Sequence, residues 1–268
     1  MAARASAARI AWLARSGYAA RGVVYLIVGG LAVLAALGGG GRTTDSEGAL
    51  RTILQQPFGE VLLALVGLGL VGYAIWRLVQ AIADPDGHGT DARGLAIRGG
   101  LLVSAVTHSL LALFALSLIF GWGSSVGGDS GAQDWTAWLL QQPFGRWLVA
   151  LIGVAVIGAG IAHMIKGYRA EFTKYLRMDP ATLEKLSPIC RFGLIARGVV
   201  FLIIGGFLAV AAWRFSSGDV VGMQGALDTL QQQPYGWILL AVVALGLFAF
   251  GVYSLIEARY RRIISPAV

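Results

Sequence analysis

The 268-residue sequence has little charge and a single cysteine. Only 13% of its residues are charged whereas 57% are hydrophobic, and its mean hydropathy is +0.71. A soluble domain of this length needs more charge on its surface, and a disordered chain would be poor in Leu, Ile, Val and Phe. Because Cys190 has no second cysteine to pair with, an internal disulfide framework and the usual cysteine metal clusters are excluded. The composition predicts a membrane protein.

Motifs that support catalysis are also missing. The sequence has no G-x-S-x-G elbow, no phosphate-binding glycine loop followed by lysine and no H-E-x-x-H pair. We therefore expect no enzymatic activity, and we predict no metal and no resident cofactor.

Six continuous apolar runs are each long enough to cross about 30 Å of hydrocarbon as a helix. They are rich in Leu, Ala and Val and lack the alternation of barrel strands. The sequence therefore predicts an all-α polytopic membrane protein with six transmembrane helices. The predicted spans are Gly17–Leu37, Phe58–Ala81, Ala96–Trp122, Phe144–Lys166, Gly193–Trp213 and Tyr235–Glu257.

The basic residues are distributed unevenly between the two sides of these spans. If the N-terminus is inside, 17 of the 21 Lys and Arg residues lie inside, and only Arg42, Arg51, Arg146 and Arg214 lie outside. Because Lys and Arg are retained in the cytoplasm, we expect both termini to be cytoplasmic and the protein to reside in a bacterial inner membrane. The spread of charge over several loops suits anionic lipid head groups, and we expect no binding to nucleic acid.

Three internal repeats run through the chain, and each opens with the pattern G-x-x-x-R-G. This pattern occurs at 17–22, 94–99 and 193–198. The first and third copies continue alike, as GVVYLIVGG and GVVFLIIGG, whereas the middle copy lacks the glycine pair. Three matches in the same order indicate a true repeat.

A second marker, Q-Q-P-[FY]-G, precedes the second span of each repeat. Proline suits the first turn of a helix because its φ is fixed and its missing N–H is harmless there. Upstream of each marker, a short amphipathic segment is expected to lie flat at the outer surface. We interpret the marker as a structural corner, with an outer partner-binding or ligand-gating surface as the alternative. Its residues are Gln56, Pro57, Gly59, Gln142, Pro143, Gly145, Gln233, Pro234 and Gly236.

Each copy contains two spans, so all three copies cross the membrane in the same direction. Parallel repeats of this kind are most simply related by a pseudo-threefold axis along the membrane normal. The predicted organisation is a basic N-terminal segment at 1–16, repeat 1 at 17–84, repeat 2 at 91–172, a cytoplasmic linker at 173–190 and repeat 3 at 191–262.

The triple R-G opening, the paired glycines and the Q-P-[FY]-G corner resemble DUF1206, a bacterial inner-membrane family of three tandem two-helix repeats catalogued as a domain of unknown function. The resemblance covers essentially the whole chain, and the middle repeat is the most divergent. It implies a six-helix bundle, and it implies no substrate, cofactor or partner.

Glycines within the spans are candidates for helix packing, because small residues let helix backbones approach closely in a membrane. The alternative is a close backbone lining for a pigment, quinone or lipid. The glycines concerned are Gly29, Gly30, Gly205, Gly206, Gly69, Gly72 and Gly158.

Arg21, Arg98 and Arg197 stand at the same place in the three repeats. A threefold arrangement would bring their guanidinium groups to one depth near the inner surface, where they are candidates for binding an anion or lipid head group. The alternative is that each reaches a lipid phosphate separately or caps a neighbouring helix.

Ionisable residues inside spans are functional candidates by default, and His108 with its neighbour Thr107 is one. A histidine bonded to a neighbouring helix, a haem or other ligand, and proton transfer are the alternatives. His163 is the one plausible partner, but it lies at a depth about 10 Å different at 1.5 Å per residue, which disfavours a haem held by both.

The repeats differ in charge at one layer near the inner end. Twenty residues after each corner proline, and again three residues later, the side chains are Arg77, His163 and Ser254, then Gln80, Lys166 and Glu257. Either Arg77 or Lys166 pairs with Glu257 and locks the inner end, or these groups are exposed separately to the interface.

The sequence leaves three functions open. The favoured one is a structural or accessory subunit that binds a larger membrane complex or lipids. The first alternative is a small-solute or ion transporter with an axial path and an inner arginine ring. The second is a binder of haem, quinone or pigment.

Overall fold

The computed structural model describes residues 2–38, 42–122 and 128–263. Its helices are α1 (Ala2–Ala36), α2 (Ser46–Leu54), α3 (Gly59–Ala83), α4 (Ala92–Phe120), α5 (Gly128–Leu140), α6 (Gly145–Tyr168), α7 (Pro180–Arg214), α8 (Met223–Gln231) and α9 (Gly236–Tyr260), with short 3-10 helices η1 (Glu171–Tyr175) and η2 (Ser217–Asp219). Within these residues no β-strand occurs, and a single antiparallel bridge joins Leu176 to Arg261.

Six of these helices, α1, α3, α4, α6, α7 and α9, are long and apolar enough to cross a membrane. This confirms the all-α prediction and its six candidate spans. Two helices extend well beyond the predicted spans, since α1 begins at Ala2 and α7 at Pro180. Much of segment 1–16 and the second half of linker 173–190 are therefore helical. Asp179 caps α7 by accepting the N–H of Thr182 at 2.9 Å.

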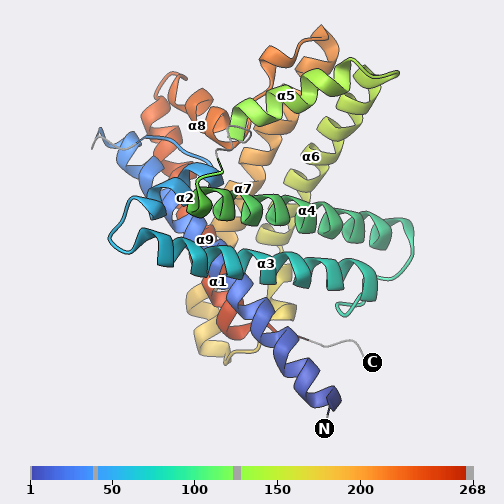
Figure 1. Cartoon of the computed structure of the whole chain (residues 1–268), viewed down its shortest axis with the longest axis vertical. Coiled ribbons are helices and arrows are strands. Elements are labelled where there is room, and N and C mark those ends of the chain that lie inside the picture. Colours follow the sequence, from blue (N-terminus) through green and yellow to red (C-terminus); the bar gives the residue numbers. More distant parts are fainter. Residues whose placement is uncertain (1, 39–41, 123–127, 264–268) are drawn as a thin grey trace.

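The long helices pack in the order α4, α3, α1, α9, α7 and α6. Figure 1 shows α3 and α4 side by side across the middle of the molecule, with α6 and α7 paired in another direction. The three most extensive pairs are α3 with α4, α1 with α9, and α6 with α7, and each joins helices of two different repeats. Packing within a repeat joins α1 to α3 and α7 to α9.

The two long helices of the second repeat, α4 and α6, do not pack extensively on each other among the described residues. They lie at the two ends of the series of contacts, and Figure 1 shows them running in different directions. Only 17% of the most apolar stretch of α6 and 22% of that of α4 is buried, compared with 56% for α9. The second repeat is therefore open where the other two are closed.

The three short helices α2, α5 and α8 each lead directly into a corner. α2 and α8 are amphipathic, and they bury Leu50 and Leu227 in the main apolar core. α5 contacts both of them, and its Asp129 accepts the N–H of Gly225 in the first turn of α8 at 2.7 Å. This end of the molecule is thus tied together across the repeats.

The corner of the first repeat is a tight turn. Gly59 donates its N–H to the Gln56 carbonyl at 2.8 Å, and Phe58 has a left-handed φ of 60°. Proline at the second position and a left-handed residue at the third are the features of a type II turn. Because α3 begins at Gly59, Pro57 precedes the helix and does not form its first turn as predicted.

The other two corners have the same geometry. Phe144 and Tyr235 have φ values of 62° and 58°, and the following glycine donates to the carbonyl three residues earlier. All three corner aromatics are at least 78% exposed, as suits side chains at a membrane interface.

The remaining corner residues make equivalent contacts in the three repeats. A Cβ atom on any of the three corner glycines would lie 2.0 Å from a carbonyl oxygen of the preceding short helix. The side-chain amide of the second glutamine donates to the carbonyl four residues earlier, at 3.2–3.3 Å. These glycines are Gly59, Gly145 and Gly236, and these glutamines are Gln56, Gln142 and Gln233.

One glycine of each predicted pair lies at a close helix contact. A Cβ atom on Gly29 would lie 2.4 Å from a backbone nitrogen of α9, and one on Gly205 would lie 2.9 Å from a carbonyl of α6. In the part of the chain that the structure describes, a Cβ atom on Gly30 or Gly206 would meet nothing within 4 Å. The packing role predicted for these two is wrong, because adjacent residues of a helix point in different directions.

The glycines of the second helices also differ between repeats. Gly69 and Gly72 bring α3 against α1, where added Cβ atoms would lie 2.6 Å from Ala20 and 2.7 Å from the Leu13 carbonyl. A Cβ atom on Gly158 would meet nothing within 4 Å among the described residues. Its predicted packing role is therefore wrong in this chain, because α4 does not cover that face of α6.

Candidate functional site: a buried arginine and glutamate network

Buried polar side chains connect α1, α3 and α9 near the end of the bundle where α1 begins and α9 ends. At the centre, Arg21 of α1 and Glu257 of α9 form an ion pair, with 2.6 Å between Nη2 and Oε2. Arg21 Nε also donates to the Ser254 hydroxyl at 3.1 Å. Both charged side chains are almost fully buried. Because a buried charge needs both a partner and hydrogen bonds, these contacts explain how an arginine is accommodated inside the bundle.

Glu257 also pairs with a second guanidinium group, that of Arg261 just after α9. Arg261 Nη1 lies 2.6 Å from Glu257 Oε1, and Nη2 lies 3.0 Å from Asp86 Oδ2. Gln80 donates a further hydrogen bond to Asp86. Burial disfavours the charged form of Arg261, but nearby anionic groups, including both carboxylates, hold its pKa well above the ordinary value.

Aromatic side chains of α1 and α3 surround these charges. The Tyr73 hydroxyl accepts hydrogen bonds from both Arg21 and Arg77, and Trp76 Nε1 donates to the Tyr18 hydroxyl at 3.2 Å. The Arg21 guanidinium carbon lies 5.0 Å from the centroid of the Tyr73 ring and 5.1 Å from that of Tyr18. Cation–π contacts of this kind add to the stabilisation by hydrogen bonds.

The loop after α3 brings Asp86 to this network. The Asp84 carboxylate accepts the backbone N–H groups of His88 at 2.8 Å and Gly89 at 2.7 Å. These two hydrogen bonds lower the pKa of Asp84 below its ordinary value. Asp84 thus fixes the path of the loop, and Asp86 is positioned to reach Arg261.

Both alternatives predicted for Glu257 are wrong, because it is buried and pairs with other cations. Glu257 pairs with Arg21 and Arg261, and no ion pair within 4.0 Å joins it to Arg77 or Lys166 among the described residues. Arg77 donates to Gln80 at 3.0 Å and to the Tyr73 hydroxyl instead. The network neutralises buried charges and joins the helices to one another. Within the described residues no three His, Cys, Asp or Glu side chains are placed to bind a metal ion.

Arg197 of α7 corresponds to Arg21, but within residues 2–38, 42–122 and 128–263 no carboxylate forms an ion pair with it. Its guanidinium carbon lies 4.5 Å from the ring centroid of Phe250 and 4.9 Å from that of Tyr25. Within the described part of the chain, its Nε and Nη1 are buried without a hydrogen-bond partner. α7 packs on α6 as α1 packs on α9, and α6 carries Lys166 at the place of Glu257.

Arg98 of α4 takes a third environment. Its Nε donates to the Ala81 carbonyl at 2.7 Å and its Nη2 to the Ile82 carbonyl at 3.0 Å, so it caps α3. Free carbonyls at a helix C-terminus attract a cation. The three arginines therefore do not form the predicted ring, since Arg21 and Arg197 share contact with Phe250 whereas Arg98 lies at the end of α3.

Thr107 and His108 are in contact, with 3.4 Å between Oγ1 and Nδ1, whereas His163 makes its contacts elsewhere. Nδ1 of His108 lies 2.8 Å from the Ser104 carbonyl, and its ring packs on Tyr73 with 4.5 Å between centroids. Thr107 is exposed and donates to the same carbonyl. His163 makes its contact to a carbonyl within α6. The ring of His163 packs on Phe201 of α7, so the two histidines have different neighbours.

The residues that sequence reasoning missed are Arg261 and Asp86. Both lie outside the predicted repeat markers, Asp86 in a loop and Arg261 one residue after a span. An acidic residue in the loop after α3 and a third arginine beside Arg259 and Arg262 were the available signals, but nothing in them specifies the pairing.

Comparisons with known proteins agree with the repeat pattern. No solved structure matches the chain. The Uncharacterized protein YxxB of Bacillus subtilis strain 168 is 41% identical over 253 residues, which cover 92% of this chain and 90% of the relative. The family described as Domain of Unknown Function (DUF1206) matches three times, at residues 16–84, 99–170 and 192–261. The six apolar helices fit an integral membrane protein. The three family matches and the relative show that the chain belongs to the DUF1206 family.

Proposed function

We propose that the protein is an accessory subunit of the bacterial inner membrane, without enzymatic activity, that binds a transmembrane helix of a larger complex at its second repeat. The observation that carries this proposal is the separation of α4 from α6, because the corresponding helices of the first and third repeats pack together. The order of contacts supports the proposed pseudo-threefold arrangement of the six helices, with the ring open between α4 and α6.

The open face of α6 carries small residues that serve for packing in the other repeats. Gly158 corresponds to Gly72, which lies against α1. Ala155 corresponds to Gly69 and is exposed. Small residues let transmembrane helices approach closely, whereas burying apolar surface gains little in lipid. A helix of a partner protein is therefore the occupant that we propose for this face.

The proposed orientation has both termini in the cytoplasm. The first turns of α1 and the last turns of α9 lie together, since Arg15 donates to the Ala258 and Arg259 carbonyls. The end that they share carries most of the basic residues, and these are retained inside. A reporter active only in the periplasm, fused to either terminus, is expected to be silent.

The accessory role is tested by comparing Gly158→Leu with Gly206→Leu in the native membrane. Both glycines have open space around the Cβ position, so both variants are expected to fold. Tagged protein extracted in mild detergent is analysed by native gel and mass spectrometry. The wild type and Gly206→Leu are expected to retain one stoichiometric membrane partner, and Gly158→Leu is expected to lose it.

Two outcomes contradict the accessory role. If the wild type migrates alone under conditions in which known complexes survive, no partner helix occupies the open face. If both variants retain the partner equally, the partner binds elsewhere and the second repeat is not the docking surface.

Transport of a small anion is a second candidate, favoured by the Arg197 guanidinium, whose Nε and Nη1 are buried without a hydrogen-bond partner among the described residues. Purified protein in liposomes is tested for chloride and phosphate uptake, alone and as Arg197→Gln. Arg93→Gln is the control because Arg93 is exposed. Uptake that only Arg197→Gln abolishes supports transport, and absence of uptake by the wild type excludes it for these anions.

A further inference from the structure

A pocket of about 750 Å³ opens at the end of the bundle where α1 begins and α9 ends. Five arginines line it, and no acidic residue does so within the described part of the chain. They come from three separate segments, namely α1, the segment after η1 and the end of α9. These arginines are Arg15, Arg177, Arg259, Arg261 and Arg262.

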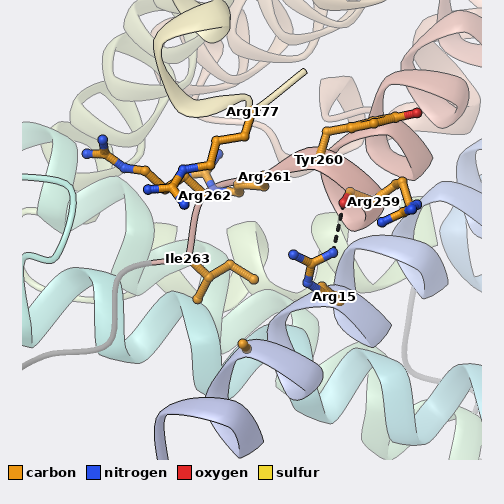
Figure 2. Close-up of a pocket in the computed structure, with 8 residues that line it drawn as sticks. Arg15, Arg177, Arg259, Tyr260, Arg261, Arg262 and Ile263 are labelled. Atoms are coloured by element: carbon orange, nitrogen blue, oxygen red, sulfur yellow. Dashed lines mark hydrogen bonds between the residues drawn. The ribbon is translucent and has the colours of Figure 1, made fainter. Parts of the chain in front are cut away.

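The backbone holds two of these arginines next to each other. Arg177 donates its N–H to the Tyr260 carbonyl at 2.8 Å, and Arg262 donates its N–H to the Tyr175 carbonyl at 2.8 Å. These bonds flank the bridge between residues 176 and 261. Figure 2 shows Arg177 and Arg262 extending to the same side of the pocket. Both side chains are exposed, so their guanidinium groups are available to a ligand.

A third arginine is fixed from the opposite wall. Nη1 of Arg15 donates to the Arg259 carbonyl at 2.8 Å, as the dashed line in Figure 2 shows. This contact places a cation at the C-terminus of α9, where the helix dipole favours it. The wall formed by α1 is thereby tied to the wall formed by α9.

Arg261 forms the buried base of this arrangement. It is 4% exposed, and its two terminal nitrogens pair with Glu257 and Asp86. Its Nε is buried without a partner among the described residues. The other four arginines have no carboxylate within 4.0 Å in the same residues, so the pocket carries an excess of positive charge that only an added anion can balance.

We propose that this pocket binds a phosphate group, supplied by an anionic phospholipid head group or by a free phosphate compound. Guanidinium groups offer paired N–H donors whose geometry matches phosphate oxygens. The pocket lies at the end of the apolar helices, which is the depth of lipid head groups, and clusters of basic residues there attract anionic lipids. The site is separate from the open second repeat and does not depend on the accessory role.

The test measures binding of full-length protein in detergent by native mass spectrometry and titration. The probes are phosphatidylglycerol, phosphatidylcholine and inorganic phosphate. The pocket variant is Arg177→Gln with Arg262→Gln. The control is Arg93→Gln with Arg169→Gln, because these arginines are exposed at the same end and lie outside the pocket. Both double variants remove the same charge and leave the buried Arg261 intact.

Phosphatidylglycerol is expected to bind the wild type and the control, and the pocket variant is expected to lose at least about tenfold in affinity, because hydrogen bonds between charged groups are removed. Binding of inorganic phosphate with the same loss, and no preference for phosphatidylglycerol, identifies a free phosphate as the ligand. An equal loss in both variants, or no loss in the pocket variant, overturns the proposal.

Discussion

Gly72 in the first repeat and Gly158 in the second stand fifteen residues after their corner prolines, yet their surroundings differ. A Cβ atom on Gly72 would approach the backbone of α1, whereas one on Gly158 would meet no described atom within 4 Å. The first glycine of each repeat also differs in its surroundings. Gly17 lies against Tyr73 of its own repeat, whereas Gly94 lies against the carbonyl of His88 in the preceding loop. Related sequences have thus produced closed and open hairpins.

The comparison shows which contacts the repeat preserves. All three pairs between repeats are kept, and only the pair within the second repeat is lost. In a membrane, apolar surface alone does not hold helices together, so the pairs that persist need close packing or polar contacts. The Arg21 and Glu257 pair supplies a polar contact between α1 and α9, and the corresponding Arg197 and Lys166 cannot do so because both are cations.

The largest expected effect is that of Glu257→Gln, compared with Lys166→Gln at the same place in the second repeat. Glu257→Gln leaves two buried guanidinium groups without their shared carboxylate, so it is expected to destabilise the protein by about 3–5 kcal/mol. Lys166→Gln removes no ion pair and is expected to have a much smaller effect. Thermal unfolding of the purified variants in one detergent, followed by tryptophan fluorescence, measures both.

A similar loss of stability in the two variants would contradict the network, because it would mean that Glu257 contributes no more than an unpaired cation. A Glu257→Gln protein too unstable to purify is compared with the wild type by its level in the membrane and its resistance to protease. Normal resistance would likewise contradict the prediction.

The next effect sharpens the comparison between closed and open hairpins. Gly72→Leu is expected to cost about 1–3 kcal/mol or more, because the added side chain forces α3 away from α1. Gly158→Leu adds the same atoms where nothing blocks them, and it is expected to change stability by less than about 0.5 kcal/mol. Unfolding temperatures of the isolated proteins provide the measurement. Equal losses would contradict the open arrangement, because Gly158 would then be packed as closely as Gly72 in the purified protein.

The sequence predicted the parts of the fold that depend on local chemistry. Six apolar runs gave six long helices, because span length and hydropathy are local properties. The corner markers lie at a turn in all three repeats, and the proline lies before the helix. The N-terminal ends of α1 and α7 were missed because polar helical turns precede their apolar spans, and hydropathy gives no signal for polar turns.

The candidate site was harder to predict because its contacts are not local. Arg21 and Glu257 are 236 residues apart, and Arg261 and Asp86 are 175 residues apart. The repeat suggested that Arg21, Arg98 and Arg197 share one environment. However, the equivalent residues on the helices that pack against them differ in charge. Symmetry in the sequence therefore predicts positions, whereas the environment of each arginine depends on residues that have diverged.

Arg98→Gln has the smallest expected effect, and it tests whether the three arginines have separate environments. Arg98 donates to two carbonyls at the end of α3, and the loss of these hydrogen bonds is expected to cost about 1 kcal/mol. Arg21→Gln removes a buried partner of Glu257 and is expected to cost about 3 kcal/mol or more. The two unfolding temperatures, with exposed Arg93→Gln as control, decide between separate roles and a shared ring.

A shared ring requires equal effects, because each arginine would then hold the same ligand and partners. A small effect for Arg98 and a large one for Arg21 instead follow from a cap on one helix and an ion pair between two.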